Sequence, residues 1–312
     1  MKKICVAGLN PAWQKTLIFQ DFKRGAVNRA AEMEKIPSGK GINFARAVKT
    51  WGIADPTVYQ FLGGDTGKCI RRGLWDETIS NVSVETDGET RTCVTVVSRS
   101  DSSSTELIEP SNTIPPVAAM QLLEALCAGL NSADALAVCG TCPPGLNEYF
   151  YGKIIRHARE NGKFILLDTV QYIETALEEG ADLVKINREE LAKLSGENDL
   201  IAGFQVFFDR FKIRYLAVTD GPDAAWFQER DQALYRVTVP ELTKEELVNP
   251  IGSGDTCSGV MLSCILNDMP VLEAFRTGLA AATANCLSRE PAVFDKEAAL
   301  ALLDRCTVQK YA

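Results

Sequence analysis

Short apolar runs alternate with amphipathic segments along most of the chain. The paired runs and segments are 3–9 with 41–52, 136–140 with 146–161, 164–170 with 173–180, 182–186 with 188–196, and 215–221 with a helix after residue 254. Repeated strand-then-helix alternation is typical of a mostly parallel sheet that is covered by helices on both faces. The pattern therefore predicts an α/β fold, organised as a single domain over residues 1–312.

Two segments, about 11–36 and 87–110, break this rhythm. They carry alternating or β-rich patterns, and no helix is expected between their paired strands. We interpret them as a small antiparallel β-sheet that projects from the main body as a lid. Such a sheet exposes one face unless a ligand or a partner subunit covers it, so we expect a homodimer through the lid.

The composition limits the ligands that the protein can attract from a distance. The chain has 312 residues, of which 46% are hydrophobic, so it can bury a large core. Its 33 Lys and Arg residues against 41 Asp and Glu residues give a formal charge of -8, which does not favour nucleic acid or an anionic membrane. The first apolar run is too short for a signal peptide, and no later segment approaches a membrane span. We expect a cytoplasmic protein that binds anions through local groups.

The cysteine and histidine residues argue against several catalytic classes. Ten cysteines without regular spacing look like reduced thiols that serve as small apolar residues. Cys139 and Cys142 have the spacing of a redox motif, but two prolines follow them where such enzymes begin a helix, so a strand-to-loop turn is favoured. The sole histidine, His157, lies among charged residues and is expected on the solvated surface. His-based triads and zinc sites are therefore hard to build.

The stretch Asn249–Gly259, NPIGSGDTCSG, is the strongest candidate for chemistry. Gly252, Ser253 and Gly254 could present backbone amides to a phosphate at the start of a helix, with Asp255 beside them as a base. Taken alone, the same residues also suit a glycine turn with an Asp cap. The choice between these interpretations depends on the other polar clusters.

Further polar clusters fall at the ends of expected strands, where ligands gather in parallel α/β sheets. The run SGKGIN, residues 38–43, opens a helix, and its glycines allow close backbone approach while Lys40 adds a positive charge. A glycine turn with a solvated lysine is the alternative. Thr219 and Gly221 end another expected strand, where they could meet phosphate or ribose, although an ordinary Asp-Gly turn explains them equally well.

Asn187 and Glu190 follow the expected strand 182–186. Because they are three residues apart, they would share one face of a helix. An amide oxygen and a carboxylate in that position could hold a hydrated magnesium ion. The same spacing also fits a capping box with Asn187 as the cap, and both interpretations stay open from the residues alone.

Taken in order, these pieces resemble one family, the ribokinase-like carbohydrate kinases, and within it the branch of 1-phosphofructokinase and tagatose-6-phosphate kinase. The resemblance covers nearly the whole chain and is carried by LNPAWQKTL, PSGKGINFARAVKTWG, FLGGDTG, STELIEP, CGTCPPGL, VKINREEL, AVTDG and NPIGSGDTCSG. It favours the phosphate cradle over the plain turn. It also implies a mostly parallel sheet flanked by helices, with a small β-sheet lid.

The resemblance implies a phosphotransferase that uses ATP and Mg²⁺. Asp255 would accept the proton of the acceptor hydroxyl, while the amides of residues 252–254 would neutralise charge on the migrating phosphoryl group. Asn187 and Glu190 would position magnesium through water. The residues that would bind ATP are Asn187, Thr219, Gly221, Gly254 and Asn285.

The same branch uses a cationic pocket for the phosphate that its sugar already carries. The residues that match this acceptor site are Gln14, Gly39, Lys40, Asn43, Arg91, Thr141 and Arg29. Asn43 would bind sugar hydroxyls, and Arg29 would reach across the dimer lid. A kinase of an uncharged sugar would not need Lys40 and Arg91 in these places, so the resemblance implies a sugar-phosphate acceptor.

The sugar side departs from the family pattern. Where the family usually has Asn-Pro-Ala-x-Asp, Gln14 offers one acceptor oxygen and an NH₂ donor in place of a carboxylate. Where the branch often has Arg-x-Asn, Cys93 replaces the amide with a thiol. Trp13, bulkier than the usual aliphatic residue, could stack on a sugar or fill the core or lid interface, and the second interpretation is favoured. We therefore expect an acceptor whose stereochemistry differs from fructose 1-phosphate or tagatose 6-phosphate.

Three alternatives stay open. One is plain 1-phosphofructokinase activity with a tolerant site, and another is a kinase of an unphosphorylated sugar. The third is a non-catalytic sensor of sugar phosphates or nucleotides on the same fold. The presence of Asp255 and of the complete GSGD sequence argues against a sensor, because a sensor needs no base.

Overall fold

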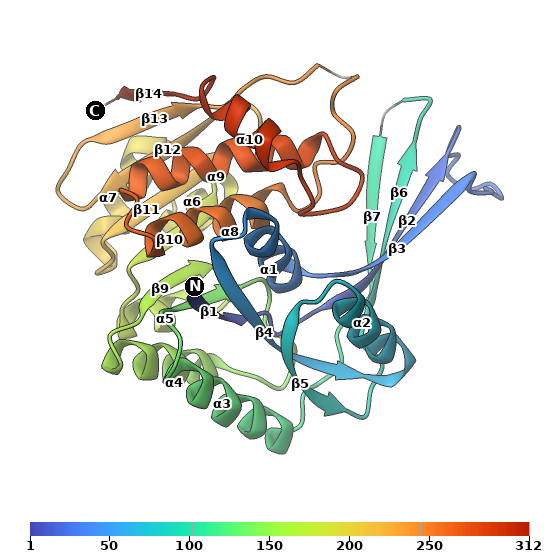
Figure 1. Ribbon diagram of the computed structural model, residues 1–312, viewed down its shortest axis with the longest axis horizontal. Helices are drawn as coiled ribbons and strands as arrows, with labels where there is room; N and C mark the ends of the chain where they lie inside the picture. Colours follow the sequence, from blue (N-terminus) through green and yellow to red (C-terminus); the bar gives the residue numbers. More distant parts are fainter. Residues whose placement is uncertain (102, 244, 312) are drawn as a thin grey trace.

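The computed structural model describes residues 1–101, 103–243 and 245–311, and it consists of a main α/β body with a smaller sheet beside it (Figure 1). Within these residues the main body is built on a ten-stranded sheet. Its strands, in spatial order, are β14 (Thr307–Lys310), β13 (Leu234–Thr238), β12 (Ala224–Glu229), β11 (Tyr215–Asp220), β10 (Leu183–Asn187), β9 (Phe164–Asp168), β8 (Ala135–Cys139), β1 (Lys2–Ala7), β4 (Ala54–Gly63) and β5 (Ser80–Thr86).

Parallel pairing dominates the main sheet. The strands from β5 to β11 in the spatial order run parallel to their neighbours, and β12, β13 and β14 extend one edge in antiparallel fashion. The carboxyl ends of the parallel strands therefore share one edge of the sheet, which is where ligands bind in such folds. The predicted α/β fold with a mostly parallel sheet is confirmed.

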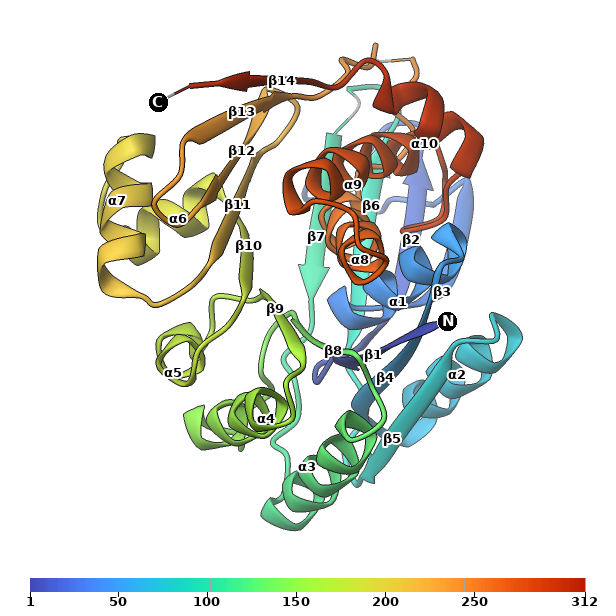
Figure 2. The same cartoon turned by 60° about the vertical axis from the view of Figure 1, so that its left-hand side comes forward.

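Helices cover both faces of the main sheet (Figure 2). They are α1 (Lys40–Trp51), α2 (Gly64–Asp76), α3 (Pro116–Leu130), α4 (Glu148–Glu160), α5 (Ile173–Glu179), α6 (Arg188–Ser195), α7 (Leu200–Arg210), α8 (Ser253–Leu266), α9 (Val271–Cys286) and α10 (Lys296–Leu303). Helices α1, α2 and α8 to α10 bury one apolar cluster, and α3 to α7 bury the other. Strand β1 serves both clusters, because Ile4 and Val6 point to the first and Cys5 and Ala7 to the second.

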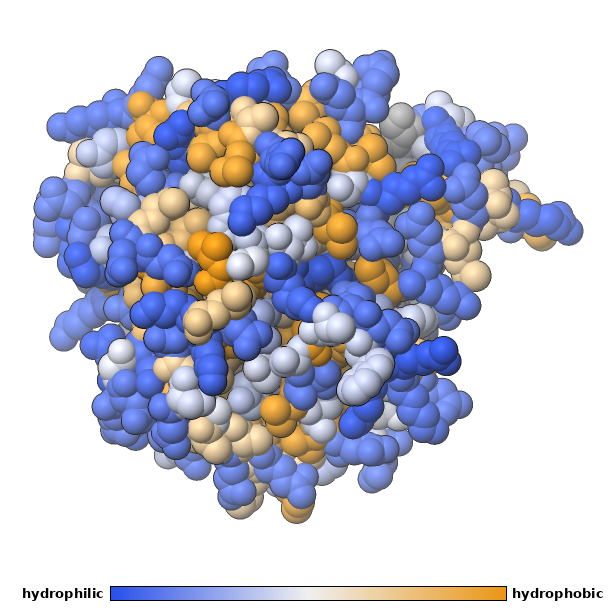
Figure 3. Space-filling view, in the orientation of Figure 1, coloured by the Kyte–Doolittle hydropathy of each residue, from blue (hydrophilic) through white to orange (hydrophobic). Residues whose placement is uncertain are grey.

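The surface of the main body is mainly hydrophilic in the view of Figure 3, with apolar residues in small groups. Isolated groups of this size are normal on a folded domain. Within the described residues, no helix has both the length and the apolar character that crossing a membrane requires.

The smaller sheet is formed by the two segments that break the main rhythm. Its order is β3 (Glu32–Ser38), β2 (Ala12–Phe19), β6 (Thr92–Ser98) and β7 (Ser103–Ile108). The two outer pairings are antiparallel, as expected, but the central pairing of β2 with β6 is parallel. Because α1, β4, α2 and β5 lie between β3 and β6 in the sequence, the chain can return to the sheet and enter β6 in the same direction as β2.

Glycines let the first turns of α1 and α8 approach their neighbours closely. Helix α1 follows Gly39, whose φ of 108° suits only glycine. A Cβ at Gly41 would collide with the backbone of Gly8, next to β1, and a Cβ at Gly259 of α8 would lie 2.8 Å from the Phe44 carbonyl oxygen of α1. Helices α1 and α8 therefore pack backbone to backbone beside the end of β1.

Candidate active site

Asp255 lies in the first turn of α8 and is only 7% exposed. The helix starts after Gly252, whose φ of 78° is in the left-handed region. The first amides of a helix have no partner within it, so they can bind an anion. The Ser253 amide already donates to the Pro250 carbonyl oxygen at 3.2 Å, so the next amide, that of Gly254, is the stronger candidate for binding an anion.

Helix α1 supplies the hydrogen-bond partner of Asp255. The Nδ2 atom of Asn43 donates to Oδ2 of Asp255 at 2.9 Å. Burial raises the pKa of Asp255 to about 6, the positive charge of Lys40 acts against this rise, and the nearby carboxylate of Asp168 adds to it. Asp255 is therefore a carboxylate that is ionised at neutral pH and is more basic than an exposed aspartate.

Asp168, at the end of β9, is the centre of a buried ionic cluster that the sequence did not reveal. It lies 3.0 Å from Nζ of Lys40 and 3.4 Å from Nζ of Lys185, and the hydroxyl of Ser258 donates to it at 2.6 Å. Burial alone would raise the pKa of Asp168, but the two ammonium groups outweigh it and hold the pKa below its ordinary range. The only sequence signal was an acidic residue at the carboxyl end of an apolar strand.

The cluster brings a buried positive charge under the start of α8. A Cβ added to Gly254 would lie 3.0 Å from Nζ of Lys185. Burial is the largest influence and acts to lower the pKa of Lys185, but Asp168, Cys257 and Asp255 together raise the pKa above its ordinary value, so the ammonium stays charged. A fixed cation and a helix N-terminus thus meet at one point, which suits the developing charge of a phosphoryl group.

A cavity of about 170 Å³ lies beside the start of α1. Four predicted acceptor residues line it together, namely Gly39, Lys40, Arg91 and Thr141. The Nη2 atom of Arg91 donates to the Asn10 carbonyl oxygen at 3.0 Å, and the Asn10 side chain donates to the Thr141 hydroxyl at 2.9 Å. Ile108 of β7 also lines this cavity, so the smaller sheet borders it.

Other predicted acceptor residues lie elsewhere. Gln14 is buried within the smaller sheet and donates from Nε2 to the Thr95 hydroxyl at 2.7 Å, and Cys93 is opposite it on β6. Trp13 lines a separate groove of about 880 Å³ together with residues of α1 and α2, which agrees with the favoured lid-interface interpretation. Arg29 is exposed in the loop between β2 and β3.

A third cavity, of about 300 Å³, lies on the other side of the α8 N-terminus. Its lining includes Thr219, Gly221, Ser253 and Gly254, and most of its surface is apolar. A flat base with a phosphate tail would suit such a groove. Asn285 is not among the lining residues.

Asn285 instead supports the α8 loop from behind. It is fully buried, its Nδ2 donates to the Ile251 carbonyl oxygen at 3.0 Å, and its Oδ1 accepts from the Ala292 amide at 2.6 Å. Both polar ends of the side chain are therefore used to hold two loops together.

Asn187 and Glu190 form a complete capping box at the start of α6. The Glu190 amide donates to the Asn187 side chain, and the Asn187 amide donates to the Glu190 carboxylate, both at 2.8 Å. The box fixes both side chains at the carboxyl end of β10. Each remaining oxygen lone pair is of the type that Mg²⁺ prefers, so the donor set fits a hydrated ion.

The comparison with known proteins decides the family. The chain matches the pfkB family carbohydrate kinases over residues 1–297. It belongs to this family. A tagatose-6-phosphate kinase of Staphylococcus epidermidis is 28% identical over 292 residues, which cover 90% of this chain and 91% of that protein.

Solved structures share the pfkB fold of this chain. Phosphofructokinase-2 from Escherichia coli in complex with fructose-6-phosphate has a TM-score of 0.87 at 22% identity and covers 98% of this chain and 99% of its own. A possible 1-phosphofructokinase from Thermotoga maritima has a TM-score of 0.84 at 22% identity, with 99% and 100% covered. The predicted family, the ribokinase-like fold and the class of phosphotransferase with a hydroxyl acceptor are confirmed.

The structure agrees with the expected reduced thiols but not with the expected solvated position of His157. Cys139 and Cys142 are buried free thiols, and burial raises the pKa of Cys142 to about 11, which disfavours redox reactivity. The expectation for His157 was wrong, since the ring is half-buried and lies 3.1 Å from the Cys127 carbonyl oxygen. The face of α4 that carries it packs on the end of α3.

Proposed function

We propose that this pfkB kinase transfers the γ-phosphoryl group of ATP to a hydroxyl of a phosphorylated sugar. The position of Asp255 is the observation that carries the proposal. Its chain neighbours Ser253 and Gly254 line the apolar groove, and its hydrogen-bond partner Asn43 lies one turn after Lys40, which lines the cationic cavity. A base between a nucleotide groove and an anion pocket is what in-line phosphoryl transfer requires.

In this mechanism Asp255 accepts the proton of the acceptor hydroxyl while the hydroxyl oxygen attacks the γ-phosphorus. The bond from the γ-phosphorus to the bridging oxygen breaks, and ADP leaves. A pKa of about 6 leaves Asp255 ionised at neutral pH and close to the optimum for a general base. The Gly254 amide and the Lys185 ammonium stabilise negative charge on the transferring group. Magnesium, when bound with ATP, supplies further charge neutralisation, and Asn187 and Glu190 would hold it through water.

A phosphorylated acceptor is supported by the charge in the small cavity. Lys40 and Arg91 both line it, and lysine binds phosphate as a point charge whereas arginine binds it as a fork. The kinase from Staphylococcus epidermidis is named for tagatose 6-phosphate, and the Escherichia coli structure holds fructose-6-phosphate. Because the amide nitrogen of Gln14 is bonded to Thr95, Gln14 offers a sugar one acceptor oxygen instead of two. We propose a ketohexose phosphate or a close stereoisomer as the acceptor.

The protein is proposed to work in the cytoplasm. The smaller sheet is proposed to act as a lid and as the dimer interface. Its outer strand β7 is exposed along its described length, with Leu107 and Ile108 more than half exposed, and Met33 on β3 is similarly exposed. The strand register places Met33 and Leu107 on one face of the sheet and Ile108 on the other, where it lines the acceptor cavity. A second lid would cover the face that carries Met33 and Leu107. The dimer would also bring the partner's loops towards the acceptor cavity, where the prediction for Arg29 can be tested.

The direct test is magnesium-dependent ADP release from ATP with a panel of acceptors. The panel contains fructose 1-phosphate, fructose 6-phosphate, tagatose 6-phosphate, other sugar phosphates and the matching free sugars. Strong turnover with one sugar phosphate is the expected result. Turnover with free sugars alone would refute the phosphate-binding role of Lys40 and Arg91, and ATP binding without any turnover would favour a sensor.

A further inference from the structure

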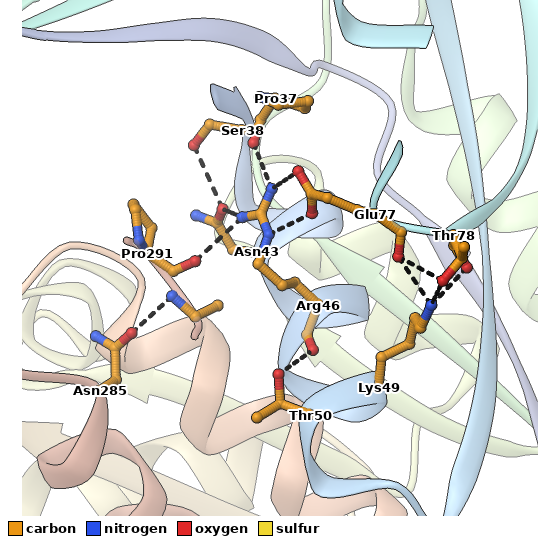
Figure 4. Close-up of polar contacts among 11 residues, drawn as sticks. Pro37, Ser38, Asn43, Arg46, Lys49, Thr50, Glu77, Thr78, Asn285 and Pro291 are labelled. Atoms are coloured by element: carbon orange, nitrogen blue, oxygen red, sulfur yellow. Dashed lines mark hydrogen bonds and ion pairs between the residues drawn. The ribbon is translucent and has the colours of Figure 1, made fainter. Parts of the chain in front are cut away.

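Arg46 of α1 is not among the lining residues of the two proposed substrate cavities, and it has an unusually complete set of hydrogen bonds. It is only 4% exposed and lines the groove of about 880 Å³. Its Nε and Nη2 atoms donate to the two carboxylate oxygens of Glu77 at 2.6 and 3.0 Å. Nη2 also donates to the Pro37 carbonyl oxygen at 2.7 Å, and Nη1 donates to the Pro291 carbonyl oxygen and to Oδ1 of Asn43, both at 3.1 Å (Figure 4).

These contacts use all five N–H groups of the guanidinium. Glu77 and the two carbonyl oxygens come from the end of α2, the end of β3 and the loop before α10. The orientation of the guanidinium is therefore fixed from four sides, and only its contact with Asn43 leads to the active site. A lysine at this position would supply one nitrogen and could not reach all of these acceptors at once.

The contact with Arg46 determines which way the Asn43 amide faces. Oδ1 of Asn43 accepts from Nη1 of Arg46 and, more weakly at 3.4 Å, from the Ser38 hydroxyl. If the amide were reversed, its NH₂ group would face the donating guanidinium, and its oxygen would face the carboxylate of Asp255. Both of these pairings are repulsive, so Arg46 directs Nδ2 of Asn43 towards Asp255.

We infer that Arg46 is a positioning residue for the base: it fixes the Asn43 amide so that Nδ2 donates to the carboxylate of Asp255. This inference rests on the proposed role of Asp255 in phosphoryl transfer. It adds a route from Glu77 through Arg46 and Asn43 to the base, and this route starts at a groove that shares no lining residue with the two proposed substrate cavities.

The consequence for Asp255 is a change in its protonation. The groups that face Asp255 are Asn43 and Lys40 of α1, Asp168 of β9, Lys185 of β10 and the thiol of Cys139 on β8. Burial is the largest cause of the raised pKa, and the hydrogen bond from Asn43 is one of the causes that lower it. Loss of that bond should raise the pKa of Asp255 by about one unit, which is the typical effect of one hydrogen bond to a charged group.

Arg46→Lys tests the inference because it keeps the positive charge and removes the fork. Arg276→Lys is the matched control, since Arg276 also binds one glutamate and two carbonyl oxygens but has no contact with Asn43. In Arg46→Lys, the midpoint of the fall in kcat/KM at low pH should move from about pH 6 to about pH 7. The value of kcat/KM at pH 9 should stay near that of the wild type. In Arg276→Lys, the midpoint should stay in place.

A second measurement needs no substrate, so it separates failure of the inference from failure of the proposed function. The wild type should lose stability relative to Asp255→Asn as pH rises from about 4 to about 6. The reason is that Asp255 ionises at a lower pH in the unfolded state than in the folded state. In the Arg46→Lys background this loss should continue to about pH 7. The four proteins are the wild type, Asp255→Asn, Arg46→Lys and the double variant. Their urea unfolding midpoints, measured across pH, give the pH range of the stability loss in each background.

The inference would be overturned if Arg46→Lys left unchanged both the pH profile of kcat/KM and the pH range of the stability loss. If Arg46→Lys does not fold, Glu77→Gln serves in its place, since it keeps Arg46 and weakens the two bonds that orient the guanidinium. It should shift the pH profile and the pH range of the stability loss in the same direction by a smaller amount, and the absence of any shift would overturn the inference.

Discussion

At the scale of single residues, Asp255 is the proposed base, and its replacement should separate binding from chemistry. Asp255→Asn keeps the size and the contact with Asn43 but cannot accept a proton. Turnover should fall by roughly 10²–10⁴-fold while ATP affinity changes little. In the wild type, kcat/KM should fall as pH drops through about 6, because the carboxylate is then protonated. Near-normal turnover of Asp255→Asn in a coupled ADP assay would remove Asp255 from this role.

Gln14 sets a second prediction at this scale. Gln14→Asp removes the NH₂ group that donates to Thr95 and provides two acceptor oxygens, and the Thr95 hydroxyl can turn to donate to one of them. Activity on ketohexose phosphates should rise about tenfold to a hundredfold, corresponding to one recovered buried hydrogen bond. Thr95→Val is the control, because it removes the same contact without adding a carboxylate. A folded Gln14→Asp protein with no gain would show that Gln14 does not select the acceptor.

At the scale of elements, the start of α1 depends on the absence of a side chain at residue 41. Gly41→Ala would force α1 away from the Gly8 backbone and displace both Lys40 and Asn43. We expect a loss of about 1–3 kcal/mol in the free energy of unfolding, together with lower turnover. Gly152→Ala in α4 is the control, since its Cβ would meet no atom closer than 3.5 Å and should stabilise the helix by up to about 1 kcal/mol. Chemical denaturation of both variants makes this comparison.

The elements also show how far the sequence could be interpreted. Repeated strand-then-helix patterns identified the α/β fold, because burial on both faces of a parallel sheet produces continuous apolar runs. The parallel pairing of β2 with β6 could not be predicted, since no local pattern sets the direction in which the chain returns. Gly39, Lys40, Arg91 and Thr141 were expected in one acceptor site from the family resemblance, and they line one cavity. Arg91 reaches it from the smaller sheet, so strand ends alone could not have placed it there.

Residues that are distant in the sequence and meet only in the tertiary structure could not be recognised from the sequence. Asp168 is 128 residues from Lys40 and 90 from Ser258, so its cluster has no local spacing that could be recognised. Arg46 was hidden for the same reason, because an arginine one turn after a binding motif looks like an ordinary surface residue of a helix. Asn285 was expected near adenine, whereas a buried amide can equally join two loops, as it does here.

At the scale of the whole molecule, the exposed lid predicts a dimer. Leu107 and Ile108 are 55% and 59% exposed, and Met33 is 54% exposed. Sedimentation should give about twice the chain mass of 34.1 kDa. Leu107→Asp should shift the protein towards monomer and lower turnover, whereas Leu300→Asp, on exposed α10, should leave the mass unchanged. A wild-type monomer at micromolar concentration would refute the lid interface.

The close packing of α8 on α1 through Gly259 also determines what happens when ATP is bound and no sugar is present. Asp255, the proposed base, and Asn43 belong to two helices in backbone contact, so their hydrogen bond is present before any acceptor arrives. A water molecule in the acceptor position would meet the same base and the same phosphoryl group. We therefore expect protection of ATP from idle hydrolysis to come from outside these helices, with the smaller sheet as the proposed lid that admits the acceptor and excludes water.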